Sequence, residues 1–337
     1  MDGFLLVDKP AGWTSSDVVC RVRAVLFGRA SRRRKASADD RVGHAGTLDP
    51  FATGLLVVGV GRATRLLELV TELPKEYRAT VALGYQTDTL DADGSVQQTA
   101  AVPALSRQLI ESALAAFVGD IDQVPPMFSA AHVDGKRLYQ LARRGIEVER
   151  SPRTIRIHAL ALVDFDDNAL TFLTRCSRGA YVRVLGADIA RELGTCGTLT
   201  ALRREAIGDL RADDAVPFGD FGKEGAFRDL EPDVLRARLL QSLLPMDAVL
   251  NHVPRLSVTA GDAERLCRGQ AVRRLSEPEP AYAVTSAESW VRVYDPTGCL
   301  VALATTTNGS LHPVRVLQHS ATEPAAPTAH DDLRRTH

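Results

Sequence analysis

The chain of 337 residues has little cysteine, little aromatic content and no long apolar run. Its five cysteines lie far apart and form no CxxC pair, which argues against a disulfide framework or a cysteine zinc site. No stretch approaches the roughly 20 apolar residues that span a bilayer, and the N-terminus lacks the pattern of a secretion signal. We therefore expect a cytoplasmic protein with no membrane partner.

Short motifs of several common enzyme classes are also missing. There is no GxxxxGK[ST] phosphate loop, no HExxH zinc motif and no GxSxG nucleophile motif. The eight histidines show no metal-ligand spacing. If the chain is an enzyme, chemistry without a metal or an organic cofactor is the simplest expectation.

The net charge of −1 conceals a strong partition along the chain. Residues 129–158 contain seven Lys/Arg against three Asp/Glu, and residues 171–211 contain seven against four. Residues 212–250 carry the opposite balance, four against eight, while a further basic cluster lies at 29–35. A solvated face explains any one cluster, but three basic clusters favour a polyanionic partner.

Apolar patterning predicts strands and helices in mixed order. Alternating or continuous apolar runs predict strands at 4–8, 55–60, 77–83, 153–166 and 170–176. Helical spacing predicts helices that begin near 14–16 or cover 64–70, 105–117, 138–144 and 185–193. The segments 28–42 and 86–103 are predicted to be loops.

The pattern changes after Pro254. Short strands are predicted at 255–258, 281–284, 290–294 and 300–305, punctuated by Gly and Pro. We expect a first domain at 1–250 with a basic insertion at 124–152, a small β domain at 254–320, and an unstructured tail at 321–337.

The segment from Gly43 to Gly54 is the most informative about function. It places Asp49 among three glycines, before Pro50 and an apolar strand. Glycines allow tight backbone and close approach of another chain, and an Asp before Pro is biased away from helix. Although a lone Asp-Pro is usually a simple turn, a rigid loop that enters a buried strand also suits a reactive side chain.

Tyr77, Tyr181 and Arg183 are the next candidates. Tyr77 opens a strand on its apolar face, a position that is usually core. Tyr181 and Arg183 lie between a strand and a helix, and would share one side if that segment were extended. A buried arginine needs an acidic partner, and a loop carboxylate would serve, but spacing alone does not identify Asp49 as that partner.

Leu202 and His44 have ordinary alternatives. Leu202 precedes Arg203 and Arg204, and an isolated leucine there is core by default. His44 lies in the glycine-rich loop, where it could stack on a nucleobase or simply be exposed.

Several motifs occur in a fixed order along residues 3–211. They are Lys9-Pro10-Ala11-Gly12-Trp13-Thr14-Ser15 (KPxGxTS), Gly43–Gly54 (GHxGTLDPxATG), Lys75-Glu76-Tyr77, Gln123–Ala130, Gly135–Tyr139, Cys176–Arg183 and Leu202-Arg203-Arg204. Together they resemble the bacterial tRNA pseudouridine-55 synthase (TruB) family. The resemblance is thinner after residue 250, where Arg268–Val272 is only suggestive.

This resemblance implies a flipped T-loop uridine of tRNA that is isomerised without a cofactor. Asp49 would be the catalytic carboxylate, by attack on the ribose, by glycal formation or by addition to the base. The roles implied for the other residues are pairing with Asp49 (Arg183), stacking on the base (Tyr181), proton transfer (Tyr77), pocket lining (Leu202), a place near the flipped nucleotide (His44) and substrate binding (Lys9, Arg65, Lys136 and Arg137).

The sequence departs from the family pattern at a few positions. Arg65 replaces a frequent Lys, Phe128 replaces a frequent Tyr, and the basic insertion at 29–40 is longer than usual. None of these changes touches Asp49, so they bear on substrate affinity rather than on the activity.

The resemblance also implies a fold and partners. The expected fold is α+β, a pseudouridine-synthase-like mixed and mostly antiparallel sheet flanked by helices, plus a small C-terminal PUA-like β domain. The expected partner is tRNA, through its T-arm and acceptor side, bound by a monomer with no obligatory protein partner. The alternatives are a guide-RNA-dependent synthase, a non-catalytic tRNA-folding protein, and a nucleoside hydrolase that would release uracil.

Overall fold

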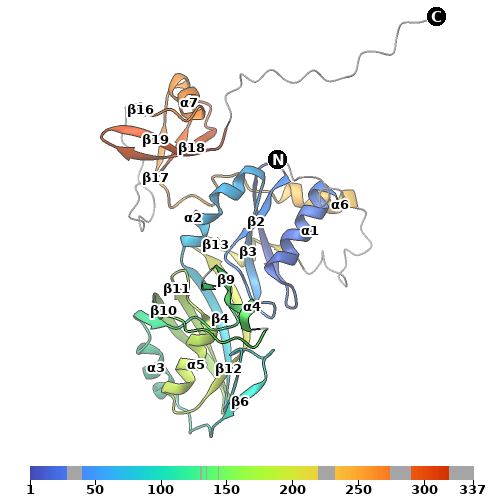
Figure 1. The fold of residues 1–337 in the computed structure, drawn as a ribbon, viewed down its shortest axis with the longest axis vertical. Coiled ribbons are helices and arrows are strands. Elements are labelled where there is room, and N and C mark those ends of the chain that lie inside the picture. The colour runs from blue at the N-terminus through green and yellow to red at the C-terminus, as the bar shows by residue number, and fades with distance from the viewer. Residues whose placement is uncertain are drawn as a thin grey trace, which may run out of the picture. The chain divides into compact units, whose positions relative to one another are not determined.

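The computed structural model describes residues 1–28, 40–129, 131–133, 135–142, 144–218, 232–273 and 290–318. The chain divides into two compact units, Met1–Pro245 and Met246–His337 (Figure 1). Almost all of the basic insertion at 29–40, the strand predicted at 281–284 and the tail at 321–337 lie outside the described residues.

A single large sheet organises the first unit. Within its described residues ten strands follow the order β14-β1-β3-β12-β4-β11-β10-β7, with β2 beside β3 and β13 beside β12. Their bounds are Gly3–Lys9 (β1), Val42–Ala45 (β2), Thr53–Val60 (β3), Lys75–Leu83 (β4), Gly119–Gln123 (β7), Arg153–Phe165 (β10), Ala169–Cys176 (β11), Gly197–Ile207 (β12), Leu210–Arg211 (β13) and Val216–Pro217 (β14). The pairs β1–β14 and β3–β12 are parallel and the others antiparallel, which confirms the predicted mixed α+β fold.

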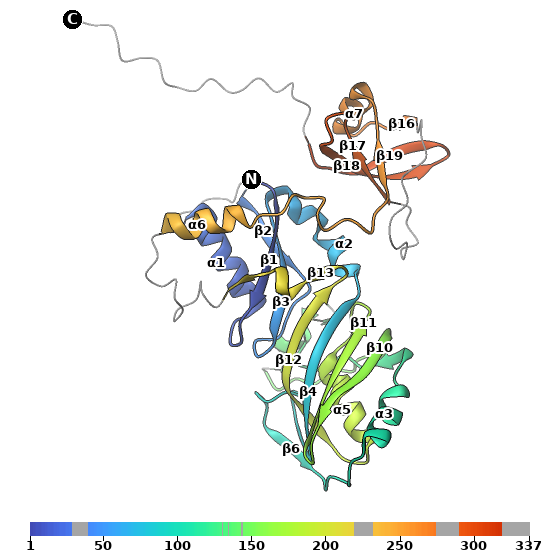
Figure 2. The same cartoon turned by 180° about the vertical axis from the view of Figure 1, so that it is seen from behind.

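Helices cover the sheet along its length. In both views α1 lies beside β1–β3, whereas α3 and α5 lie beside β4, β10 and β12 (Figures 1 and 2). Thr14 and Asp17 form a reciprocal capping box that starts α1, as the sequence predicts. The helix bounds are Ser15–Phe27 (α1), Gly61–Leu66 (η3, a 3₁₀ helix), Leu67–Glu72 (α2), Arg107–Ala115 (α3), Leu138–Ala142 (α4), Val182–Glu192 (α5), Ala212–Asp214 (η4, 3₁₀) and Pro232–Gln241 (α6).

Strand β4 shows how the sheet separates its two faces. Its residues alternate between buried and more exposed side chains, so Tyr77, Ala79 and Val81 face the core while Arg78 points to the other side. The buried face packs with residues of α3 and α5 into one hydrophobic cluster. A second cluster joins α1 and α6 to β1 and β3.

Two elements near the site differ from the sequence prediction. The central strand β12 was not predicted, because a register shift at Leu199–Ala201 breaks its alternation. The supposed loop at 86–103 contains a hairpin of β5 (Tyr85–Thr87) and β6 (Val96–Thr99). β6 is fully exposed, so its sequence carries no apolar signal.

The N-terminus of α5 is a further correction. Tyr181 is the residue that precedes this helix, and Arg183 lies in its first turn, so the extended segment considered from the sequence is not formed. Their side chains are therefore set by helix geometry rather than by strand alternation.

The predicted basic insertion contains short elements. Strands β8 (His132–Val133) and β9 (Lys136–Arg137) pair in a hairpin, and α4 follows directly. The helix predicted at 138–144 is thus present in shorter form.

In its described residues the second unit is a small β domain with one helix. Its sheet follows the order β15-β17-β18-β19-β16, with a compact apolar core. The bounds are Arg255–Ser257 (β15), Ala260–Cys267 (α7), Val272–Arg273 (β16), Trp290–Tyr294 (β17), Leu300–Thr307 (β18) and Ser310–Val316 (β19). Three of the four predicted strands are confirmed, and α7, capped by Thr259, was not predicted. None of the helices in the described ranges is long and apolar enough to cross a membrane.

Candidate active site

Asp49 lies in the loop that joins β2 to β3. The two strands pair antiparallel, from Val42 opposite Val60 to Ala45 opposite Val57, so residues 46–52 form the connection. At its end Gly54 has a φ of +100°, and a Cβ there would lie 2.3 Å from the backbone oxygen of Arg204. Only glycine permits this approach, which fixes the loop against β12.

The loop is also tied to the first strand and helix. Lys9 is fully buried, and its Nζ donates to the carbonyls of Pro10 (2.9 Å), Trp13 (2.7 Å) and Pro50 (3.1 Å). Burial lowers the pKa of Lys9 to about 8, and nearby Asp49 opposes this shift. The predicted substrate contact of Lys9 therefore does not fit its position, because all three donors hold the protein's own backbone.

Arg183 meets Asp49 in a two-pronged ion pair. Nε lies 2.9 Å from Oδ2 of Asp49, and Nη2 donates to Oδ1 at 3.2 Å. The Arg183 side chain is only 4% exposed, whereas that of Asp49 is 33% exposed. The fold thus buries the cation and leaves part of the carboxylate open, as a reactive group requires.

A second carboxylate, Asp91, completes this network. Its Oδ2 lies 3.2 Å from Nη1 of Arg183, and it accepts a hydrogen bond from Thr89 at 2.5 Å. Arg183 also donates to the carbonyls of Thr89 and Phe128, each at 2.7 Å. Sequence reasoning missed Asp91, because it lies in a segment predicted to be loop and among other acidic residues that carry no periodic signal.

Opposing effects act on Asp49, and their net result is a raised pKa. Burial raises the pKa of Asp49 and the charge of Asp91 adds to that rise, while the Arg183 guanidinium opposes it. Because the partner is a cation in bidentate contact, we expect an ionised carboxylate near neutral pH.

Tyr77 and Leu202 lie together on the buried face of the sheet. Tyr77 is 9% exposed and Leu202 is 8% exposed, and both belong to the cluster that includes Leu48 of the Asp49 loop. Burial raises the pKa of Tyr77, and the neighbouring guanidinium of Arg204 opposes this shift. The phenol is therefore neutral at pH 7 and able to donate or accept a hydrogen bond.

Tyr181 and His44 are half-buried beside this core. The Tyr181 backbone amide donates to Oε1 of Gln123 at 2.9 Å, which fixes the start of α5. Within the described part of the chain, Nδ1 of His44 is buried without a hydrogen-bond partner. Burial, followed by the charge of Arg204, lowers the pKa of His44, so its ring is neutral at pH 7.

The remaining predicted binding residues are not part of this group. Arg65 is exposed in η3, which follows the far end of β3. The eight residues of β3 put about 23 Å between the Asp49 loop and that end. Lys136 and Arg137 belong to β9, but their side chains lie outside what the structure describes.

The basic segment 171–211 does not form the free cationic surface that its composition suggests. Arg183 is bound to Asp49 and Asp91, and Arg204 is buried. The other five arginines each form an ion pair, namely Arg175 and Arg211 with Glu76, Arg178 with Glu72, Arg191 with Asp188, and Arg203 with Asp8 and Glu205. In the segment 129–158, by contrast, exposed Arg144 and Arg153 have no carboxylate partner among the described residues.

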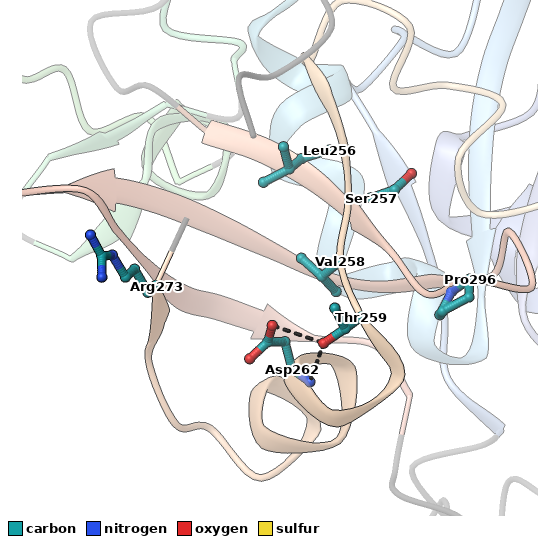
Figure 3. Close-up of a pocket in the computed structure, with 7 residues that line it drawn as sticks. All are labelled: Leu256, Ser257, Val258, Thr259, Asp262, Arg273 and Pro296. Atoms are coloured by element: carbon teal, nitrogen blue, oxygen red, sulfur yellow. Dashed lines mark hydrogen bonds between the residues drawn. The ribbon is translucent and has the colours of Figure 1, made fainter. Parts of the chain in front are cut away.

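A separate cavity of about 310 Å³ lies in the second unit (Figure 3). Its lining is mostly apolar, and Thr259 and Asp262 there are engaged in the capping interaction of α7. It contains none of the predicted site residues. Over the described ranges no group of three or more His, Cys, Asp or Glu side chains could hold a metal ion.

Comparisons with known families agree with this arrangement. Residues 33–182 match the N-terminal domain of the TruB family of pseudouridylate synthases, and residues 254–317 match the C-terminal domain of pseudouridine synthase II TruB. The match to two separate domains covers both structural units.

Three curated relatives share the name tRNA pseudouridine synthase B. A tRNA pseudouridine synthase B of Psychrobacter cryohalolentis is 40% identical over 85% of this chain and 76% of its own length. That of Dehalococcoides mccartyi is 35% identical over 97% of this chain and 100% of its own length. That of Caulobacter vibrioides is 39% identical over 94% and 96%.

Solved structures share the fold. A Cbf5–Nop10–Gar1 complex superposes with a TM-score of 0.67 at 21% identity, covering 94% of this chain and 85% of that chain. An H/ACA RNP bound to a substrate RNA gives 0.68 at 19% identity, covering 96% and 87%. At this identity the likeness supports the fold alone, whereas the sequence relatives identify the enzyme. The chain belongs to the TruB family of tRNA pseudouridine synthases, isomerases that act on uridine in tRNA.

Proposed function

We propose that this chain converts uridine 55 in the T-loop of tRNA to pseudouridine by a reaction that depends on Asp49 and on no cofactor. The single observation that carries this proposal is a partly open carboxylate, held in two-pronged contact by buried Arg183 within the GHxGTLDPxATG loop. Such a group is fixed in direction yet accessible to a nucleotide that has left its stack.

The overall reaction balances without a co-reactant. The bond from C1′ to N1 of the base breaks, a bond from C1′ to C5 forms, the C5 proton leaves and N1 gains a proton. No electrons are transferred to or from the substrate. Asp49 assists either by bonding to C1′, by taking a proton from the ribose, or by adding to the base, and all three routes use an ionised carboxylate.

The surrounding residues have distinct proposed roles. Arg183 positions Asp49, and Asp91 positions Arg183 by holding its other guanidinium nitrogen. Tyr77 is proposed to move the C5 proton, because its neutral hydroxyl belongs to the buried cluster that includes Leu48 of the Asp49 loop. Tyr181 would stack on the base and Leu202 would line its pocket.

His44 is proposed to lie near the flipped nucleotide. Its ring is neutral and one of its nitrogens is buried without a partner, so it could hydrogen-bond or stack. Lys9 takes a positioning role in place of the predicted substrate contact, because it holds the Pro50 carbonyl next to Asp49.

For tRNA binding we propose the insertion 124–152 as the main contact with the T-arm, including Lys136 and Arg137. Exposed Arg144 supports this role, since its charge is available to phosphates. Arg65 would bind the RNA backbone at a distance from the reacting base. The small β domain would contact the acceptor side, and a monomer would act alone in the cytoplasm.

The direct test incubates the purified protein with an unmodified tRNA transcript and maps pseudouridine by a specific reagent and nucleoside analysis. We expect one pseudouridine, at position 55, and none with Asp49→Asn, whose tRNA affinity should stay within about tenfold of wild type. Tight binding without pseudouridine would instead favour a tRNA-folding protein or a missing guide RNA, and released uracil would favour a hydrolase.

A control experiment tests whether the reaction depends on a metal ion. We expect the same rate of the chemical step before and after dialysis against EDTA, because Asp49, Arg183 and Tyr77 supply the acid–base and electrostatic groups themselves. A rate that falls with EDTA and recovers with one added metal would contradict the cofactor-free proposal.

A further inference from the structure

Arg204 is the largest fully buried side chain of the described residues, and the proposed reaction does not use it. It is 1% exposed. Its Nε donates to the carbonyl of Leu55 at 2.7 Å and its Nη2 to the carbonyl of Gly46 at 3.0 Å. Within the described ranges no carboxylate pairs with it. A buried guanidinium without an anion is costly, so its retention calls for a specific role.

The strand register places Arg204 between the two proposed reacting groups. On β4 it is the direct cross-strand partner of Tyr77, and on β3 it is the partner of Gly54, which ends the Asp49 loop. Directly opposed residues of an antiparallel pair project from the same face, so the guanidinium and the phenol lie side by side.

The Asp49 loop is built around this side chain. A Cβ added to Gly46 would lie 3.3 Å from Nη1 of Arg204, and one added to Gly54 would lie 2.3 Å from its backbone oxygen. Both glycines have positive φ, at +74° and +100°. The start and the end of the loop that carries Asp49 thus close on one residue.

Neighbouring titratable groups respond to the same charge. Arg204 contributes, after burial, to the lowered pKa of His44 and to the lowered pKa of Lys75, which falls to about 8. Its charge also opposes the rise that burial causes in the pKa of Tyr77.

We propose that Arg204 is a positioning residue of the isomerisation: its buried guanidinium holds the Gly46 end of the Asp49 loop and lies beside its cross-strand partner Tyr77, and so fixes the spacing of the two groups that act on uridine. This role rests on the proposed function, since it needs both Asp49 and Tyr77 to face the same nucleotide. Arg204 itself touches no substrate atom. Its contribution is geometric, and a small displacement of either group would be felt in the chemical step.

The test compares Arg204→Lys with Arg203→Lys. Lysine keeps the charge at position 204 but loses the planar fork that reaches two carbonyls. Arg203 is the adjacent residue on the opposite face, where it pairs with Asp8, and serves as the matched control. Single-turnover rates are measured on an unmodified T-arm RNA with enzyme in excess, over a range of enzyme concentrations that reaches saturation.

This design separates positioning from folding. An unfolded fraction lowers the concentration of competent enzyme and raises the half-saturation point, but it leaves the saturating rate constant unchanged. For Arg204→Lys we expect the saturating rate constant to fall about a hundredfold while the half-saturation point stays within about threefold. For Arg203→Lys we expect both values within about threefold of wild type.

The proposal is overturned if the saturating rate constant of Arg204→Lys stays within about threefold of wild type, or if only its half-saturation point changes. Arg204→Gln, which keeps a planar donor group without the charge, replaces the lysine variant if circular dichroism shows that the latter is unfolded, and the same two outcomes decide. The wild-type reaction on the same RNA is the reference. Its absence would refute the proposed function, whereas a normal wild-type rate with an unaffected variant refutes only the role of Arg204.

Discussion

The two faces of strand β12 place two neighbouring arginines in opposite environments. Arg203 is one-third exposed and pairs with Asp8 and Glu205 on the open face of the sheet. Arg204, the next residue, is buried on the core face, where it donates to the carbonyls of Leu55 and Gly46 and lies opposite Tyr77. A shift of one position along a strand therefore separates a surface ion pair from a part of the site.

The contrast extends across the sheet. On the open face Arg78 pairs with Glu205, and Arg175 and Arg211 share Glu76. Such exposed pairs contribute little individually, because water and salt screen them. On the core side the buried guanidinium of Arg183 binds two carboxylates, so each lost contact leaves a buried charge short of a partner. All of these arginines are equivalent in the amino-acid composition. Their contributions to the free energy of folding differ, because some ion pairs are exposed and others are buried.

The largest expected effect in this comparison, after loss of Asp49 itself, comes from Asp91→Asn. This change removes one of the two carboxylates that hold buried Arg183, so Asp49 is less well placed. We expect the single-turnover rate constant to fall by about ten- to a hundredfold, with tRNA affinity little changed. An unchanged rate constant would remove Asp91 from the site.

The Asp91→Asn change should also alter the pH dependence of the reaction rate. The charge of Asp91 raises the pKa of Asp49, so its removal should lower that pKa. The proposed reaction needs ionised Asp49, so its rate should be lost as pH falls through this pKa. The acid limb of the pH–rate profile should therefore move to lower pH in Asp91→Asn. A limb that moves to higher pH would show that Asp91 acts on Asp49 in another way.

A smaller effect, on the salt dependence of tRNA binding, should distinguish the basic segment 129–158 from the basic segment 171–211. Exposed Arg144 and Arg153 have no carboxylate partner within the described structure, whereas Arg175 and Arg211 are paired with Glu76. The double change to alanine at 144 and 153 should reduce the slope of log affinity against log salt by about 1.5, because two phosphate contacts are lost. Alanine at 175 and 211 should change it by less than about 0.5. Equal slopes for the two variants would contradict the distinction.

The smallest effect is expected on the open face. Arg78→Ala breaks an ion pair whose arginine is 46% exposed. We expect a loss of less than about 1 kcal/mol in the free energy of unfolding, and a rate constant within about twofold of wild type. Urea unfolding measures the first and single-turnover kinetics the second. A loss of several kcal/mol would show that the open face stabilises the fold as strongly as the buried one.

Local sequence predicted much of the fold. Strands β1, β3, β4, β10 and β11 and helices α1, α3 and α5 follow from apolar periodicity and from caps such as Thr14. Strands β12 and β6 were missed, since β12 contains a register shift and β6 is exposed on both faces. In both cases the pairing partner, not the local pattern, makes the strand.

The site residues also fall into two groups: those that sequence motifs predict and those that only the fold brings together. The motif around Asp49 identifies the carboxylate, and the order of motifs identifies the family. The position of Lys9 was misjudged, because nothing in a lysine's sequence context shows that three carbonyls will surround it. Asp91 was missed for a related reason: its partner lies on another element, at the start of α5.

By itself the sequence determined the α+β class, the small β domain and the family, and it predicted the role of Asp49, because periodicity and motifs are local properties of the chain. Only the tertiary structure decided which arginine holds which carboxylate. Arg183 reaches Asp49 across 134 residues, and Arg204 reaches Gly46 across 158. Burial and pairing depend on which strands become neighbours. That arrangement decides which arginines form surface ion pairs and which hold other residues of the site in place.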